Sequence, residues 1–452
     1  MHGASLSRWT MSYFAAACLF LILGQGMMAA GYGYPAVSVA APETLALVHV
    51  LAIGWLSLLM AGALLQFVPV LIARPLVGGR FAPAILALLV GGLLLLVSGF
   101  VALSGTANLS LGLLPLGGLL LLSGFGLLAG VLAATLLSAR PLALPARFVA
   151  LGVTALVATA LLGTAFSLGL SGAVESPLLD TLVGEGIGLH AAFGLGGWLS
   201  LTAIGVSYRL FPMFLLSPET EKATSRAVWW SGAAALGLVA ACVPLLLLLA
   251  AAGMEILLSL AALLTLALVL LYGHDAIGFY RARKRKQAEL NIRASLVALA
   301  MLAAATLLFL LPARATAGES AAALVYLFVF GWLTGLGLSQ LYKIVAFMTW
   351  LESYGPVLGR APVPRVQDLV AERRAFVLFC LYYAAVSAAT LSLFAGSGGL
   401  FRASVCVQLA ATVALVNEFV RARRLSYVPA ALRAPAGAVI PRLFLPTFAP
   451  RR

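Results

Sequence analysis

Two histidines inside apolar stretches are the side chains of this sequence best suited to chemistry. His49 and His190 each lie about one helical turn into a stretch that is long enough to cross a membrane. An imidazole can ligate a metal ion, and an ionisable group within a membrane is costly enough to indicate a function. The plainer alternative is that each ring only hydrogen-bonds a carbonyl group. We interpret the pair as candidate haem or metal ligands that point into the same interior, though not at the same point.

A Gly-Trp pair follows each histidine and occurs a third time further along the chain. The three copies are Gly54-Trp55, Gly197-Trp198 and Gly331-Trp332. A period this long indicates three copies of a multi-helix unit rather than a solenoid. His49 precedes its tryptophan by six residues and His190 by eight, while the third copy carries Tyr326 at the His49 offset. We therefore expect a cofactor-binding interior bordered by His49, Tyr326, Trp55, Trp198 and Trp332.

Three polar residues share another offset, eleven residues after each tryptophan: Gln66, Arg209 and Lys343. One interpretation is that the two cations extend along their helices to lipid headgroups. The other is that all three point into a central cavity and form a polar, anion-binding ring. The second interpretation expects uncompensated charge, because the nearest acid in the same helices is Glu352, about two turns beyond Lys343.

The elements that must position these residues are membrane helices. The chain has 452 residues, of which 63% are hydrophobic and 9% charged, whereas soluble domains carry about 25% charged residues. This composition excludes a soluble globular protein and predicts an all-α integral membrane protein that contacts the lipid bilayer. Twelve helices are predicted, at about residues 11–31, 43–72, 83–104, 110–137, 147–171, 186–216, 227–249, 254–280, 291–311, 320–350, 373–394 and 400–420.

The basic residues give the orientation of these helices. The formal charge is +14, but the Lys and Arg residues lie in alternate loops, which excludes nucleic acid as the reason for it. The opposite loops contain only Arg314 and Arg402 and include the acidic stretch 175–185. The asymmetry predicts a multi-pass protein of a bacterial inner membrane with both termini in the cytoplasm.

Twelve helices and three copies of the motif predict three pseudo-symmetric four-helix units. We place them at residues 1–145, 146–290 and 291–425, followed by a cytoplasmic tail at 426–452, within a single membrane domain. The Gly-Trp motif then falls on the second helix of each unit. These three helices are the longest and are expected to line the centre.

The chain resembles subunit I of the haem-copper oxidase superfamily, with its relatives the nitric oxide reductases and the NnrS-type membrane proteins. The likeness covers most of residues 11–420. It rests on twelve helices with both ends cytoplasmic, three four-helix units, and His49 in the outer part of the second helix. The resemblance implies that His49 is an axial ligand of haem b and that His190 is a copper ligand.

The sequence also departs from that family. The tenth helix carries Tyr326 and no histidine, and residues 228–249 of the seventh helix contain none. A low-spin haem normally takes two axial ligands, and a copper site of this kind about three imidazoles. We therefore expect no respiratory enzyme activity but an accessory, trafficking or nitric-oxide-related protein, with a c-type cytochrome or respiratory-complex assembly factors as partners. The alternative is a transporter that moves an anionic or amphipathic small molecule through the central cavity.

Overall fold

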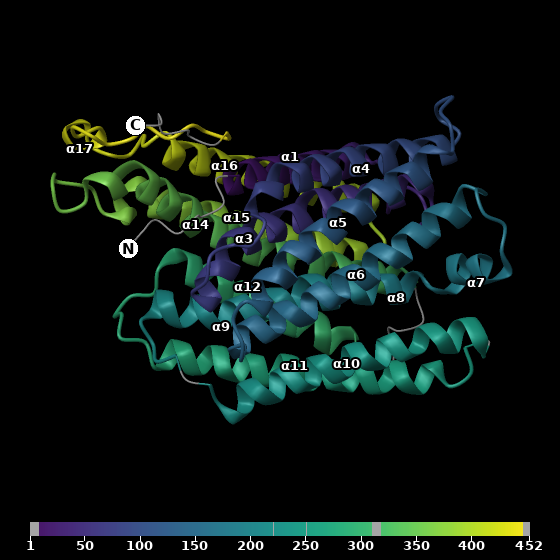
Figure 1. Cartoon of the computed structure of the whole chain (residues 1–452). Coiled ribbons are helices and arrows are strands. Elements are labelled where there is room, and N and C mark those ends of the chain that lie inside the picture. The colour runs from purple at the N-terminus through teal and green to yellow at the C-terminus, as the bar shows by residue number, and fades with distance from the viewer. Residues whose placement is uncertain (1–8, 220, 250, 310–317, 446–452) are drawn as a thin grey trace.

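The described part of the protein is a single bundle of long helices (Figure 1). The computed structural model describes residues 9–219, 221–249, 251–309 and 318–445, and all of their regular structure is helical. Twelve helices in these ranges are long and apolar enough to cross a membrane, which confirms the predicted number. Most of their ends lie within a few residues of the predicted ones, and the tenth span extends furthest beyond them, over Ser320–Val357.

Nine of the twelve spans are continuous helices. They are α1 (Thr10–Ala30), α4 (Ala82–Leu103, preceded by the short η2, Gly79–Phe81), α5 (Leu113–Leu137), α6 (Leu144–Leu170), α10 (Ala223–Leu248), α11 (Met254–Arg281), α12 (Leu290–Phe309), α15 (Glu372–Phe394) and α16 (Gly398–Arg423). Short helices lie outside the spans: α7 (Pro177–Glu185), η7 (Val366–Leu369) and α17 (Ala430–Arg433), while η6 (Gly355–Val357) ends the tenth span.

The second, sixth and tenth spans, which we call the central spans, each change their helical type within the membrane. The second consists of α2 (Pro42–His49), η1 (Val50–Ser57) and α3 (Leu58–Ile72); the sixth of α8 (Ile187–Ala191), η3 (Ala192–Leu201) and α9 (Thr202–Leu215); the tenth of α13 (Gly318–Tyr326), η5 (Leu327–Thr334) and α14 (Gly335–Tyr354). Each middle segment is a π-helix and contains the Gly-Trp pair. π-helical turns are rare and often occur at functional sites, and hydrophobic periodicity did not predict them.

The central spans form the core of the bundle. The indoles of Trp55, Trp198 and Trp332 are at most 1% exposed. Apolar side chains of all three central spans line one internal cavity on the C-terminal side of the tryptophans. The expectation that these three helices line the centre therefore agrees with the structure.

The described chain begins and ends at the same end of the bundle. The Ser12 hydroxyl at the start of α1 donates a hydrogen bond to the Phe444 carbonyl in the tail. The tail also packs on the end of α14, where the Val439 amide donates to the Ser353 carbonyl at 3.0 Å. Helix α7 lies at the opposite end (Figure 1).

Close packing along the sixth span gives a first prediction, for Gly205→Ala. A Cβ on Gly205 would lie 2.2 Å from Phe148 Cβ and 3.1 Å from the Pro145 carbonyl oxygen, so neither neighbour leaves room for it. We expect Gly205→Ala to destabilise the protein by about 1–3 kcal/mol, measured by unfolding in detergent. Gly196→Ala on the same span is the control, because nothing lies within 4 Å of its added Cβ. Equal stability of the two variants would contradict this packing.

Candidate functional site

The structure brings the two membrane histidines together. His49 is the last residue of α2 and directly precedes the π-helical segment η1. His190 lies in α8, one residue before that helix ends and η3 begins. Their ring centroids are 6.4 Å apart, with an angle of 30° between the ring planes. We predicted that the two rings point into the same interior but not at the same point, and the structure places them next to one another. We call these two residues the histidine pair.

The surroundings of the histidine pair are apolar. The Phe100 ring of α4 lies 5.2 Å from the His49 ring, and the Phe166 ring of α6 lies 5.4 Å from the His190 ring. A Cβ on Gly163 would lie 3.1 Å from His190 Cε1, so glycine at this position of α6 makes room for the imidazole. Both histidines are half-buried. The pair thus lies between α4 and α6.

Hydrogen bonding leaves ring nitrogens of the pair available. His49 Nδ1 lies 2.7 Å from the Leu45 carbonyl oxygen. A carbonyl oxygen can only accept, so Nδ1 carries the proton and Nε2 keeps a free lone pair. His190 Nδ1 is buried and has no hydrogen-bond partner within the described ranges. A carbonyl on one ring nitrogen with the other free is the usual arrangement of a metal-ligating histidine.

Tyr326 belongs to a different cluster from the one expected. Its hydroxyl donates to Gln408 Oε1 on α16, and its ring packs 5.4 Å from Phe401. His49 instead contacts Phe100 and His190. The structure therefore does not join Tyr326 to the histidine pair, although Tyr326 and His49 precede their tryptophans by the same six residues.

The three motif tryptophans form a closed ring of hydrogen bonds between the central spans. Each indole N–H donates to a hydroxyl two residues after the tryptophan of another central span. The pairs are Trp55 to Thr334 at 2.9 Å, Trp332 to Ser200 at 3.2 Å and Trp198 to Ser57 at 3.1 Å. We call these six residues the tryptophan ring. It lies between the histidine pair on its N-terminal side and the cavity on its C-terminal side.

The central cavity is small and almost entirely apolar. Its volume is about 90 Å³, whereas sites for small organic ligands measure about 300–1,000 Å³. Leu56, Leu199 and Leu333, which directly follow the three tryptophans, are among its lining residues. Its polar lining residues are Ser207 and Gln340, and the cavity does not reach either histidine.

The residues expected to form an anion-binding ring are not a set of uncompensated cations. Arg209 forms an ion pair with Glu219, and Lys343 Nζ lies 2.7 Å from Glu289 Oε2. Gln66 is buried, and its Oε1 has no hydrogen-bond partner in the described chain. We expected no nearby acid in the same helices, and the acids that neutralise the two cations come from outside them. Both acids lie in loops, where a search of the helices alone did not find them.

The Lys343–Glu289 ion pair predicts a specific pH dependence. Burial raises the pKa of the Glu289 carboxyl, but the hydrogen bonds and charges of Lys343 and Arg285 outweigh it, and the pKa is lowered overall. A lowered pKa adds stability that is present above the unfolded value, about 4.3, and is lost as the pH falls through the folded value. Between pH 7 and pH 3.5 the thermal midpoint should therefore fall further in the wild type than in Glu289→Gln. Parallel pH profiles would exclude this contribution.

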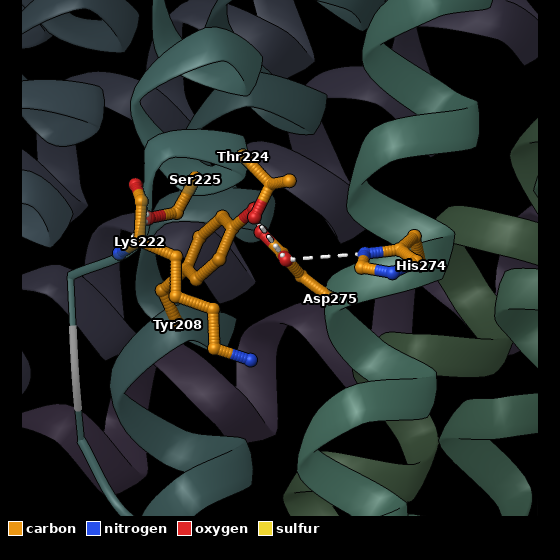
Figure 2. Close-up of polar contacts among 6 residues, drawn as sticks. All are labelled: Tyr208, Lys222, Thr224, Ser225, His274 and Asp275. Atoms are coloured by element: carbon orange, nitrogen blue, oxygen red, sulfur yellow. Dashed lines mark hydrogen bonds and ion pairs between the residues drawn. The ribbon is translucent and has the colours of Figure 1, made fainter.

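A second buried polar cluster lies around Asp275 of α11 (Figure 2). The Asp275 side chain is 0% exposed. Its carboxylate accepts a hydrogen bond from the Tyr208 hydroxyl at 2.9 Å and another from the Thr224 hydroxyl at 2.6 Å. Nδ1 of the exposed His274 lies 3.6 Å from the same carboxylate. The hydroxyl donors satisfy a carboxylate that would otherwise be costly to bury, and they tie α9, α10 and α11 together.

Comparison with known protein families and with curated proteins found no match to this chain. The described residues contain no group of three or more His, Cys, Asp or Glu side chains that could hold a metal ion. A site built on the histidine pair would take its remaining ligands from a cofactor or from a small molecule.

The three hydroxyl acceptors of the tryptophan ring were not among the predicted site residues. The sequence does show a pattern that indicates them, because Ser57, Ser200 and Thr334 each follow their tryptophan by two residues. A buried indole N–H needs an acceptor. A hydroxyl repeated at one offset in three spans was therefore a candidate acceptor set.

Proposed function

We propose that this protein is a haem-copper oxidase subunit I-like membrane protein that holds a haem iron or a copper ion between His49 and His190. The observation that carries the proposal is the approach of the two imidazoles to 6.4 Å between ring centroids. The role is accessory: metal or haem trafficking, or a response to nitric oxide. Candidate partners are a c-type cytochrome or respiratory-complex assembly factors.

The histidine pair would supply two nearby imidazole ligands to one metal centre. The two ring centroids are 6.4 Å apart, with 30° between the ring planes. The unpartnered Nδ1 of His190 and the carbonyl-oriented ring of His49 agree with ligand roles. When bound, the metal would supply electron transfer or binding of a small molecule.

The residues around the pair would control access to such a centre. Phe100 and Phe166 exclude water from the two imidazoles, and a dry shell alters the redox potential of a metal. The Leu45 carbonyl fixes the orientation of the His49 ring. With two protein ligands, the proposed centre binds metal less firmly than a three-imidazole site, which favours an accessory role over respiration.

The proposal includes three pseudo-symmetric four-helix units with the central spans at their shared axis. Support comes from the tryptophan ring, in which each central span donates one bond and accepts one bond in a closed cycle. Further support comes from the π-helical segment that contains the Gly-Trp pair in each central span. Bundles of this kind place their cofactor ligands on inward-facing helices.

The proposed orientation places both termini in the cytoplasm of a bacterium and the histidine pair in the outer half of its inner membrane. The basic loops support it, because Lys and Arg gather on the cytoplasmic side. The first and last described residues lie at one end of the bundle, which a count of twelve spans requires. Histidines that precede the tryptophans then lie toward the opposite face.

The transporter alternative has weaker support. Its anion-binding ring needs net positive charge at the cavity, but Arg209 and Lys343 each pair with a carboxylate. The cavity is also smaller than the sites that hold small organic ligands. An anionic or amphipathic substrate would require both the ion pairs and the cavity to rearrange.

A spectroscopic titration of the purified protein tests the proposal. Haem and, separately, copper(I) with a competing chelator are added to detergent-solubilised protein. We expect saturation at about one equivalent of one of the two, because the pair can ligate a single centre. A shifted Soret band identifies haem, and copper taken from the chelator identifies copper. Failure of both to bind would reject the proposal.

A further inference from the structure

One buried position of the tenth span differs in residue type and packing from the equivalent position of the other two central spans. Seven residues after the tryptophan, the second and sixth spans carry Gly62 and Gly205. Each glycine packs against an aromatic residue: an added Cβ would lie 2.6 Å from Tyr13 Cβ in one case and 2.2 Å from Phe148 Cβ in the other. At these two positions a large ring fills the space that the glycine leaves.

The tenth span replaces this aromatic–glycine packing with small polar side chains. Its residue at the same offset is Ser339, whose Oγ lies 2.8 Å from Ser295 Oγ on α12. Gln340 Nε2 also donates to Ser295 Oγ at 2.8 Å. Two serines fill less space than an aromatic ring beside a glycine, and their hydroxyls need hydrogen-bond partners.

Unpartnered polar atoms gather around these serines. Asn291 lies one turn before Ser295 and is 1% exposed, and neither its side-chain nitrogen nor its oxygen has a hydrogen-bond partner within the described ranges. Gln340 Oε1 is likewise buried without a partner there. Buried polar groups are nearly always paired, so several unpaired ones in one place indicate bound water.

The position of this cluster connects two features already described. Gln340 also lines the central cavity. In the other direction, Asn291 follows Glu289 by two residues, and Gln340 precedes Lys343 by three. The Lys343–Glu289 ion pair is partly exposed, with side-chain exposures of 15% and 12%. The polar cluster therefore lies between the cavity and a partly exposed ion pair.

We propose that Asn291, Ser295, Ser339 and Gln340 line a water-occupied inlet that leads from the Lys343–Glu289 ion pair to the central cavity. The ion pair closes the mouth of the inlet. The lining side chains offer both donors and acceptors and carry no charge, so the inlet suits water. This assignment is independent of any metal at the histidine pair.

Cysteine accessibility tests the inlet. Ser295→Cys, a change of almost no volume, is made in a chain whose four native cysteines are replaced by alanine. Inside-out vesicles are exposed to Ag⁺, which is small enough to enter a water-filled space, and the remaining thiols are counted after denaturation with a polyethylene-glycol maleimide. Thr135→Cys is the control, because Thr135 is 0% exposed and its hydroxyl has both a donor and an acceptor partner.

We expect Ag⁺ to block Ser295→Cys about tenfold faster than Thr135→Cys, because water already occupies the inlet. Adding Glu289→Gln should increase the rate further by removing the closing ion pair. Equal rates for Ser295→Cys and Thr135→Cys would overturn the inlet, and no effect of Glu289→Gln would overturn the ion pair as its closure. If Ser295→Cys does not elute as a folded monodisperse protein, Ser339→Cys takes its place.

Discussion

Trp55→Ala should be among the most destabilising single truncations in the bundle. The Trp55 side chain is 0% exposed, and its indole N–H donates to Thr334 on another central span. Removal leaves a large cavity at the centre and an unpaired hydroxyl, at an expected cost of about 3–5 kcal/mol. Trp198→Ala and Trp332→Ala should cost similar amounts, because the tryptophan ring repeats the same contact. Unfolding in detergent measures the loss.

Conservative variants separate the hydrogen bonds of the ring from its packing. Ser57→Ala leaves the Trp198 N–H buried without its acceptor, so we expect a loss of about 1–3 kcal/mol. Ser104→Ala is the matched control, because the Ser104 hydroxyl bonds only groups in its own exposed turn. If Ser57→Ala is as stable as Ser104→Ala, the ring contributes packing alone.

His49→Ala and His190→Ala should each weaken metal or haem binding by about 100-fold or more, because each removes one of two protein ligands. The expected losses are similar, since the two rings lie next to one another, with centroids 6.4 Å apart. Equilibrium titration against a competing chelator, or the amplitude of the Soret band for haem, measures the loss. Binding that survives both single substitutions would place the metal elsewhere.

Two controls accompany the histidine variants. His274→Ala should leave binding unchanged, because that side chain is 71% exposed and lies beside Asp275, outside the histidine pair. Phe100→Leu keeps both imidazoles but changes the ring against His49, so it should shift the spectrum or potential with a smaller loss of affinity. A loss in His274→Ala equal to that in His49→Ala would indicate non-specific binding.

The helices of this protein followed from composition and hydropathy, because a membrane requires long apolar segments whatever their tertiary contacts. The central position of the second, sixth and tenth spans followed from their length and from the repeated Gly-Trp pair. The pairing of His49 with His190 did not follow. Both precede π-helical segments, and a π-helical turn contains more residues than an α-helical turn, so the direction of a side chain cannot be carried through it by α-helical periodicity.

The charge partners were unpredictable for a different reason. Glu219 and Glu289 lie in loops, and the course of a loop depends on how its two helices pack. The same holds for Tyr326, whose partner Gln408 comes from α16, 82 residues further along the chain. Counting residues from each Gly-Trp pair identifies equivalent backbone positions in the three central spans. It does not identify the side chains that contact those positions, which differ from one central span to the next.

Metal content is the most direct test of the central proposal that His49 and His190 hold one metal centre. The wild-type protein and the His49→Ala/His190→Ala double variant are purified in parallel from cells supplied with copper and a haem precursor, and iron and copper are measured per chain. The proposal predicts about one equivalent of haem iron or copper in the wild type and almost none in a folded double variant. Equal metal content in the two proteins, or a metal-free wild type, would contradict it.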